Sequence, residues 1–226
     1  MVVARVVGAA CLLLAWRIWA TIPRRWRQRS ARLHRESPEK TSTAESTRPL
    51  AAVNTLVVLG SGGHTSEMLR LVSHLSPETY SPLCYIVAST DHTSADRIPK
   101  EDLRSGRCSV RRIPRSREVG QSYLTSVFTT LFAVLKAAFV VVKIRPDLVL
   151  VNGPGTCIPV CVAASVLRFF GLASSCSRTI FCESFCRVRS LSLSGRIMYL
   201  LADRFVVHWP ELLPEYPRAE YAGQLM

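Results

Sequence analysis

Two glycine-containing segments carry residue types that bind phosphate groups. The first reads Gly60-Ser61-Gly62-Gly63-His64; it follows an apolar run and precedes Thr65, a residue type that caps helices. Glycines let the backbone approach a phosphate closely, and the N–H groups at a helix start attract its negative charge. The segment lacks the third glycine of a dinucleotide fingerprint and the Gly-Lys-Ser/Thr end of a P-loop. A tight turn between a strand and a helix is the alternative explanation of its glycines.

The second segment, Asn152-Gly153-Pro154-Gly155-Thr156, repeats this device after another apolar run. Two ionisable side chains accompany the loops. His64 would lie at a helix start, where an imidazole donates to a phosphate or acts as a base near neutral pH, although a lone histidine is more often structural. Glu183 follows the apolar run TIFC, where its carboxylate would accept a sugar or lipid-linked hydroxyl or pair with Arg187. We therefore predict His64 and Glu183 as catalytic residues.

An arginine-rich stretch separates the two loops in the chain. Its members are Arg111, Arg112, Arg115 and Arg117. The planar guanidinium group suits a diphosphate or an anionic lipid headgroup, whereas a solvated loop is the commoner explanation of such a stretch. We include Arg115 and Arg117 with the two glycine segments in a predicted diphosphate cleft.

The eight cysteines show neither a disulfide framework nor a metal-binding pattern. Most lie within apolar runs such as CIPVCVAAS and TIFCESFC, which is typical of small buried side chains in a reducing compartment. The pairs Cys157/Cys161 and Cys182/Cys186 lack the C-x2-C spacing and the histidine partners of a zinc site. We therefore predict no metal site and no cofactor.

The apolar pattern predicts the scaffold that positions these residues. It indicates buried strands at residues 54–60, 83–90, 110–113, 147–152, 179–183 and 204–209. Helical spacing indicates helices at residues 65–75, 121–144, 161–172 and 192–201. The alternating order predicts an α/β fold with a single Rossmann-like, doubly wound parallel sheet, in which ligands gather at the carboxyl ends of the strands.

The helix around residues 123–144 contains one charge, Lys136, before the basic flank that begins at Lys143, and it is long enough to span a membrane. Both of its flanks are basic, so no charge asymmetry orients it in a bilayer. Large apolar residues recur at helical spacing at Leu124, Val127, Phe128, Leu131, Leu135, Phe139 and Val142. We therefore expect a helix that packs on the domain and has an apolar outer face, which lies on a membrane or on a partner.

The length of the chain and the distribution of its charge predict one folded domain preceded by a basic N-terminal region. The 226 residues leave one domain of ordinary size once an N-terminal apolar segment and a polar stretch are set aside. The net charge is +13, which by itself does not separate nucleic acid, phosphate and anionic lipid as partners. Residues 1–48 contain ten basic and three acidic groups, a net +7, so over half of the excess lies outside the predicted domain.

The N-terminal segment has the features of a transmembrane anchor. Val6–Trp16 is an uninterrupted apolar run, and six arginines lie between residue 22 and the first acidic residue, Glu36. By the positive-inside rule the short N-terminus is lumenal and the domain is cytosolic. A cleaved signal peptide and a mitochondrial presequence are the alternatives. We expect an anchor at 1–22, a basic juxtamembrane segment and flexible tether at 23–50, and a Rossmann-like domain at 51–226.

Six stretches resemble, in order, the family of membrane-anchoring subunits of the eukaryotic dolichol-linked N-acetylglucosaminyltransferase, which acts in asparagine-linked glycosylation. They are VVLGSGGHTSEMLRL, RRIPRSREVGQS, PDLVLVNGPGTCIPV, ESFCRV, LSLSGRI and DRFVVHWPELLPEYPRAEYAG. The glycine loop is also similar to the acceptor-side loop of the bacterial lipid II synthase, a related two-domain glycosyltransferase. The first 50 residues match the family only in kind, and Ala222 stands where the family pattern has a leucine.

The resemblance implies a split enzyme of the GT-B type. This chain would supply the anchor and the acceptor-binding half, and a separate soluble subunit would supply the UDP-N-acetylglucosamine half. Together they would add a second N-acetylglucosamine to GlcNAc-diphosphodolichol on the cytosolic face of the endoplasmic reticulum. Residues 60–65 would face the acceptor diphosphate, and residues 152–156 and Glu183 would border the cleft between the subunits.

Three other functions remain open at this level. A standalone membrane-tethered nucleotide-binding enzyme would be active without a partner and would need an acidic ribose contact, which the sequence does not offer. A non-enzymatic membrane scaffold would only recruit a protein. Nucleic-acid binding is disfavoured because the arginine runs lack interleaved aromatic residues. The resemblance implies that the chain is not an enzyme on its own but an essential subunit of a glycosyltransferase complex.

Overall fold

Seven parallel strands form the sheet that positions the predicted site. The computed structural model describes residues 52–117, 120–153, 155–172 and 177–223. The strands lie in the order β3-β2-β1-β4-β5-β6-β7, and all neighbouring pairs are parallel. Their bounds are β1 Thr55–Val58, β2 Leu83–Ala88, β3 Cys108–Ile113, β4 Leu148–Asn152, β5 Arg178–Cys182, β6 Arg204–Val207 and β7 Ala219–Tyr221.

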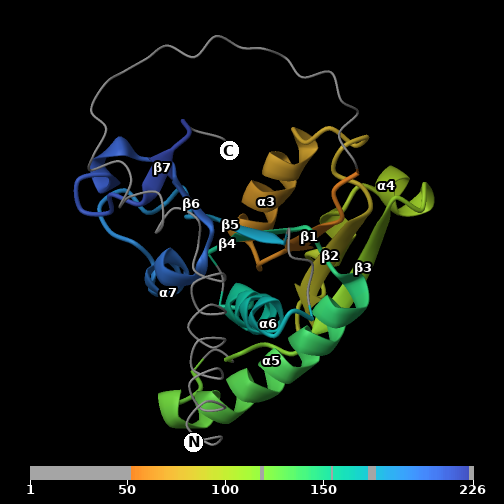
Figure 1. Cartoon of the computed structure of the whole chain (residues 1–226), viewed down its shortest axis with the longest axis horizontal. Helices are drawn as coiled ribbons and strands as arrows, with labels where there is room; N and C mark the ends of the chain where they lie inside the picture. The colour runs from red at the N-terminus through yellow and green to blue at the C-terminus, as the bar shows by residue number, and fades with distance from the viewer. Residues whose placement is uncertain (1–51, 118–119, 154, 173–176, 224–226) are drawn as a thin grey trace, which may run out of the picture.

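Helices cover both faces of this sheet (Figure 1). Helices α3 and α4 lie on one face, and α5, α6 and α7 lie on the other. Their bounds are α3 Gly63–Ser73, α4 Lys100–Arg104, α5 Tyr123–Ile144, α6 Cys157–Phe169 and α7 Leu193–Leu201, with two short 3-10 helices, η1 Ala95–Arg97 and η2 Pro210–Leu212. The predicted doubly wound α/β fold is confirmed.

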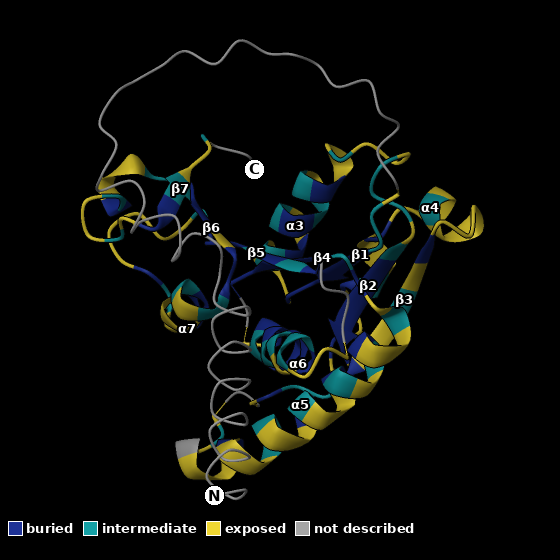
Figure 2. Ribbon diagram, viewed as in Figure 1, coloured by how far each residue is buried: buried dark blue, intermediate teal, exposed yellow. Residues whose placement is uncertain are grey.

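One apolar cluster on each face of the sheet forms the core. Leu56 and Val58 of β1 belong to the cluster under α5, α6 and α7, whereas Val57 and the following Leu59 belong to the cluster under α3. This alternation is the two-residue repeat of a strand. Because both faces are covered, all of β1 is buried (Figure 2), and its sequence is therefore a continuous apolar run.

Several boundaries differ from the predictions. Helix α3 begins at Gly63, and α6 begins at Cys157, four residues before the predicted start. Pro159 therefore lies in the first turn of α6, where its missing N–H breaks no helical hydrogen bond. Helix α4 and strand β7 have no counterpart in the prediction because five and three residues are too few to display a repeat. The predicted anchor and tether lie outside the described residues.

The cysteines of the described residues are mostly small buried side chains, as predicted. Those in the interior are Cys84, Cys108, Cys157, Cys161 and Cys182. Burial raises the pKa of the Cys157 thiol to about 12, so this thiol stays uncharged at neutral pH. Cys186 is exposed.

Helix α5 turns small residues toward the domain and large ones outward. Ala133 and Ala137 are fully buried, and such small side chains allow α6 to pack closely against α5. The predicted stripe lies on the opposite side, where Leu124, Phe128 and Phe139 are 83%, 77% and 71% exposed. The apolar outer face is thus confirmed. Residues 124–144 also have the length and composition of a membrane span.

We predict that Ala137→Leu destabilises the protein by about 1–3 kcal/mol, because the added carbon atoms do not fit between α5 and the core. Leu135→Ala, on the same helix at a side chain that is 63% exposed, should change the free energy of unfolding by less than about 0.5 kcal/mol. Urea denaturation measures both values. Equal effects, or the reverse order, would contradict the observed orientation of α5.

Candidate functional site

Three strand ends meet at one edge of the sheet. Strand β4 lies between β1 and β5, and the three strands are parallel, so the segments that follow them lie side by side. These segments are residues 60–63 after β1, residues 152–153 and 155–156 at the end of β4, and residues 183–186 after β5. The structure therefore brings both predicted glycine loops and Glu183 to the same edge.

The first of these segments, which we call the glycine loop (residues 60–63), has an exposed crest. Ser61, Gly62 and Gly63 are exposed, and Gly62 is the residue that precedes α3. Gly62 has φ of 65° and ψ of −126°, a conformation that a residue with a Cβ rarely adopts. The first N–H groups of an α-helix have no partner within the helix. The N–H groups at the start of α3 are therefore available to a ligand at the crest.

Thr65 lies within α3 and is not its N-cap, so the prediction of a threonine cap is wrong. The helix starts earlier because Gly62 makes the turn. The Thr65 side chain is fully buried; its hydroxyl donates to the carbonyl oxygen of Gly60, and its Oγ1 lies 2.7 Å from Oγ of Ser94. Thr65 therefore supports the glycine loop from the interior.

An imidazole and a carboxylate form a pair in the first turns of α3. Nδ1 of His64 lies 3.1 Å from Oε2 of Glu67, three residues along the same helix face. The His64 side chain is 33% exposed and the Glu67 side chain 16%, so the carboxylate lies deeper than the ring. With a carboxylate beside it, Nδ1 carries the proton, and Nε2 is the ring nitrogen that can accept one.

Glu67 also joins the other two strand ends. The hydroxyl of Ser184 donates to Oε1 at 3.2 Å, and Nδ2 of Asn152 lies 3.4 Å from Oε2. The same Nδ2 donates to the carbonyl oxygen of His64 at 2.8 Å. Burial would raise the pKa of the Glu67 carboxyl, but the hydrogen bond and charge of His64, with the bonds from Ser184 and the backbone of Phe185, lower it. The carboxylate is therefore ionised at neutral pH and gathers donors from three segments.

The second loop packs directly against His64. A Cβ atom at Gly153 would lie 2.6 Å from Cε1 of the imidazole, so a glycine is needed for this close approach. Asn152 and Thr156 are buried, whereas Gly155 is exposed. The structure thus places Gly153 against the ring and directs the side chains of Asn152 and Thr156 into the interior.

Glu183 is fully buried and holds the start of α7. Its Oε1 accepts the N–H of Ser184 at 3.0 Å, and its Oε2 accepts the N–H and the hydroxyl of Ser192 at 3.1 and 3.2 Å. Ser192 is the N-cap of α7, and its Oγ accepts the N–H of Gly195 at 2.8 Å. Both Glu183 oxygens are therefore engaged in positioning Ser184 and α7.

The arginine segment adjoins the second loop. The hydroxyl of Ser116 donates to the carbonyl oxygen of Gly155 at 2.7 Å, and the hydroxyl of Thr129 in α5 donates to the carbonyl oxygen of Ser116 at 2.7 Å. Arg115 is half-buried and Arg117 is exposed. Residues 115–117 are thus tied between α5 and the second loop, at the same edge of the sheet as the predicted cleft.

A cavity of about 510 Å³ opens at this edge. It is lined by Gly63, His64, Glu67, Gly153, Ser184, Cys186, Arg187, Ser192, Leu193 and Ser194. Its volume is within the range of small-molecule sites. His64, Gly63 and Gly153 of the predicted site contribute to its wall, whereas Glu183 does not.

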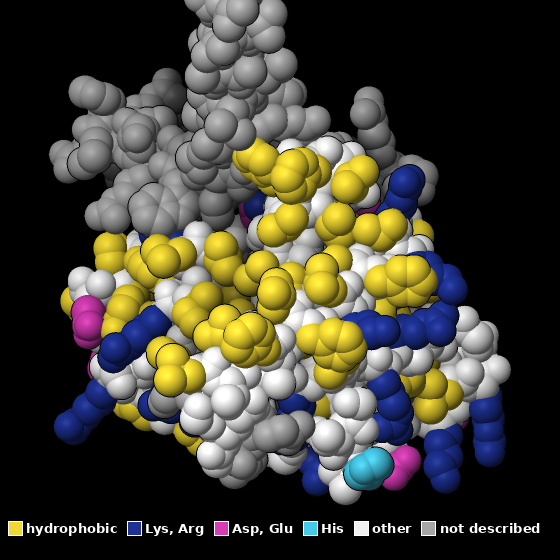
Figure 3. Space-filling model, turned by 90° about the horizontal axis from the view of Figure 1, so that it is seen from below, with side chains coloured by type: hydrophobic (Ala, Val, Ile, Leu, Met, Phe, Trp, Pro, Cys, Tyr) yellow, Lys and Arg dark blue, Asp and Glu magenta, His cyan; other side chains and the backbone are white. Residues whose placement is uncertain are grey.

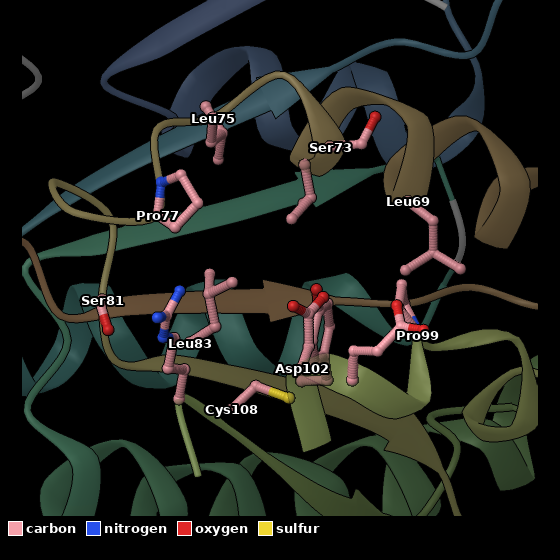
Figure 4. A pocket seen from close by; sticks show the side chains of 13 residues that line it. Leu69, Ser73, Leu75, Pro77, Ser81, Leu83, Pro99, Asp102 and Cys108 are labelled. Carbon is pink, nitrogen blue, oxygen red and sulfur yellow. The ribbon is translucent and has the colours of Figure 1, made fainter. Parts of the chain in front are cut away.

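A second cavity, of about 310 Å³, lies at the other end of α3 (Figure 4). Leu69 and Ser73 line it from α3 and Leu75 from the turn that follows the helix, and Leu83 and Cys108 line it as the first residues of β2 and β3. No residue of the predicted site lines this cavity. The carboxyl edge around His64 is therefore the candidate functional site.

Sequence reasoning missed three residues that hold the site together, namely Glu67, Ser184 and Ser116. For Glu67 the available signal was its position three residues after His64, because side chains three residues apart lie on one face of a helix. Ser184 directly follows the predicted Glu183. The contact of Ser116 depends on the path of the loop between β3 and α5, which no local pattern indicates.

The chain has a Rossmann-like parallel sheet with a glycine loop and a ligand-sized cavity at its carboxyl edge, which is the architecture of one half of the GT-B fold. The structure of MurG from Acinetobacter baumannii shares this fold, with a TM-score of 0.51 and 17% sequence identity. The similarity covers 70% of this chain and 42% of that chain, so this chain spans less than half of MurG.

Sequence comparison narrows the class to a family. The family described as "Oligosaccharide biosynthesis protein Alg14 like" matches residues 55–225. A Rattus norvegicus protein named UDP-N-acetylglucosamine transferase subunit ALG14 is 40% identical over 97% of this chain and 95% of its own length. The Homo sapiens protein of the same name is 39% identical over 100% of this chain and 98% of its own. The chain belongs to the Alg14-like family of oligosaccharide biosynthesis proteins, as the resemblance predicts.

We predict that Gly153→Ala displaces the His64 ring, because the new methyl group overlaps the position of Cε1. The variant should shift the His64 Cε1–H signal in NMR spectra and lower the free energy of unfolding by about 1–3 kcal/mol. Gly155→Ala is the matched control, since a Cβ there meets no atom within 4 Å. An unchanged His64 signal in Gly153→Ala would show that the ring does not pack on this loop.

Proposed function

We propose that this chain is the membrane-anchored, acceptor-binding subunit of a split UDP-N-acetylglucosamine transferase. A soluble catalytic subunit carries the UDP-GlcNAc site and is recruited to the cytosolic face of the endoplasmic reticulum. The complex adds the second N-acetylglucosamine to GlcNAc-diphosphodolichol, a step in making lipid-linked oligosaccharide for protein N-glycosylation. Membership of the Alg14-like family and the names of the rat and human relatives support this proposal.

One structural observation carries the proposal: Gly63 of the glycine loop and the His64–Glu67 pair line the same cavity. The N–H groups at the start of α3 suit a diphosphate, and Nε2 of His64 suits a hydroxyl that must lose a proton. A sugar linked to a diphosphate carries both groups in one molecule. An acceptor bound with its diphosphate at the loop therefore directs its sugar toward the imidazole.

The transfer is a displacement at the anomeric carbon of the donor sugar. The acceptor hydroxyl oxygen forms a bond to that carbon, the bond from carbon to UDP breaks, and UDP leaves with the electron pair. The hydroxyl proton passes to Nε2 of His64. The Glu67 carboxylate keeps the ring oriented and stabilises the positive charge that the ring gains.

The remaining predicted residues take supporting roles in this proposal. Glu183 acts as a positioning residue, because its carboxylate is buried and both oxygens hold Ser184 and the start of α7. Residues 152–156 border the cleft to the soluble subunit. Arg115 and Arg117 stabilise the acceptor diphosphate or a lipid headgroup from beside Gly155.

The face formed by α5, α6 and α7 gives the chain a membrane contact in addition to the proposed anchor. Figure 3 shows hydrophobic side chains spread across this face, with Lys and Arg side chains mostly toward its edges. Only 17% of the most apolar stretch of α5 is buried in the domain. Because α5 nevertheless packs along α6, we place it on the surface of the domain and not across a bilayer on its own. Exposed Lys143, Arg145, Arg187 and Arg196 suit anionic headgroups.

The direct test is reconstitution of the full chain with the soluble subunit, UDP-GlcNAc and a GlcNAc-diphosphate lipid. We expect transfer only when both subunits are present. His64→Gln should lower kcat by at least about 100-fold because the base is lost, and Gly63→Trp should block the loop. His74→Gln, at the exposed other end of α3, is the control. Transfer by this chain alone, or full activity of His64→Gln, would overturn the proposal.

Vesicle sedimentation tests the membrane contact. Deleting residues 1–35 should leave part of the binding to vesicles that contain anionic lipid, since the apolar face remains. Phe128→Glu with Phe139→Glu in the deleted chain should then release it, because two charges would enter the lipid interface. Leu103→Glu, on α4 at the opposite face of the sheet, should not release the deleted chain from the vesicles. Complete release by the deletion alone would exclude this role of α5.

A further inference from the structure

The segment that follows β2 packs against the glycine loop. Strand β2 is the neighbour of β1 in the sheet, so its carboxyl end lies beside the loop that follows β1. Residues 91–97, which include η1, leave that end and contact the loop through side chains. We call this segment the support arm; none of its residues belongs to the site predicted from the sequence.

A buried chain of polar groups joins the arm to Gly60. Oγ of Ser94 lies 2.6 Å from Oδ2 of Asp91 and 2.9 Å from the carbonyl oxygen of Gly60. Asp91 and Ser94 are 5% and 1% exposed, and Thr65 reaches the same carbonyl from α3. A serine hydroxyl has one proton, so the Asp91 carboxylate and the carbonyl oxygen of Gly60 share the Ser94 proton, while Thr65 donates its own proton to the same carbonyl.

The Asp91 carboxylate is held in its charged form. Its Oδ1 accepts the N–H groups of Thr93 and Ser94 at 3.1 and 3.0 Å. Burial would raise the pKa of this carboxyl, but these bonds and the hydroxyl of Ser94 lower it. Nη1 of Arg112 donates to the Asp91 carbonyl oxygen at 3.1 Å, which ties the arm to β3. The arm is thus held in place by hydrogen bonds within itself and by a hydrogen bond from β3.

The far end of the arm holds a second carbonyl of the loop. Nη1 of Arg97 donates to the carbonyl oxygen of Gly62 at 3.0 Å and to Oγ of Ser66 at 3.2 Å. Arg97 is exposed, so its positive charge stands beside the crest of the loop. The arm therefore engages the carbonyl oxygens on both sides of Ser61.

A loop that binds an anion must keep its carbonyl oxygens away from the ligand and its N–H groups toward it. We propose that residues 91–97 preorganise the glycine loop for a diphosphate, with Asp91 and Ser94 fixing the carbonyl of Gly60 and Arg97 fixing the carbonyl of Gly62. Asp91, Ser94 and Arg97 are positioning residues in this scheme. The inference rests on the proposed function, because it takes the diphosphate of the acceptor as the ligand of the loop.

Titration of the full chain with inorganic pyrophosphate, followed by calorimetry, tests the arm without catalysis. Ser94→Ala and Arg97→Met should each weaken binding by about tenfold or more, the effect expected when hydrogen bonds that hold a charge-binding loop are lost. Ser73→Ala and Arg104→Met are the controls, at exposed positions on α3 and α4 away from the loop. Because Arg97 is exposed, its variants should fold even if Ser94→Ala does not.

Arg97→Lys separates positioning from charge. Lysine keeps the positive charge, but its side chain is one bond shorter than that of arginine, so its ammonium does not reach the position of Nη1 between Gly62 and Ser66. Pyrophosphate binding should therefore stay weaker than in the unsubstituted protein. In the complex with the soluble subunit, Arg97→Met should raise KM for the lipid acceptor about tenfold, with KM for UDP-GlcNAc and kcat unchanged. A merely structural defect would instead lower kcat by reducing the active fraction.

The outcomes distinguish the two proposals. If the unsubstituted chain does not bind pyrophosphate, the diphosphate site and the arm are both wrong. If it binds, and Ser94→Ala and Arg97→Met bind equally well, the arm is wrong and the proposed function stands. If Arg97→Lys binds pyrophosphate as tightly as the unsubstituted protein does, Arg97 acts only through its charge, and its positioning role is wrong.

Discussion

The carboxylate of Glu67 is the group on which the geometry of the site depends. A partly buried carboxylate is costly unless donors surround it, and here the donors come from different segments. His64 contributes the imidazole 3.1 Å away, Ser184 a hydroxyl at 3.2 Å, and Asn152 an amide at 3.4 Å. These segments follow β1, β5 and β4. One negative charge thus fixes the relative position of three loops that are distant in the sequence.

The fold makes this meeting possible. Parallel pairing of β1, β4 and β5 places their carboxyl ends side by side, and Gly153 lets the second loop lie against the imidazole. On the far side of the sheet, Ala133 and Ala137 bring α5 close to the domain and leave Phe128 outside. Polar and apolar surfaces are therefore separated: polar groups gather at the strand ends, and apolar groups gather over α5, α6 and α7.

The sequence predicted the architecture better than the contacts within it. Buried strands such as β1 read as mostly apolar runs, and the glycine loops were predicted at the carboxyl ends of strands, where the structure has them. The partners of those loops could not be predicted, because Ser94 and Ser184 reach them only through strand neighbours set by the sheet order. Glu183 illustrates the limit: its place at a strand end led us to predict a site residue, but only the fold shows that its carboxylate is buried against α7.

The most direct test of this account is a double-mutant cycle between His64 and Glu67, measured as the rate of N-acetylglucosamine transfer by the complex. Glu67→Gln removes the charge that orients the imidazole, so it should slow transfer about tenfold or more when His64 is present, a coupling of about 1.4 kcal/mol or more. In the His64→Gln background the same substitution should have almost no further effect. Equal losses in both backgrounds would contradict the account, because they would mean that Glu67 does not act through His64.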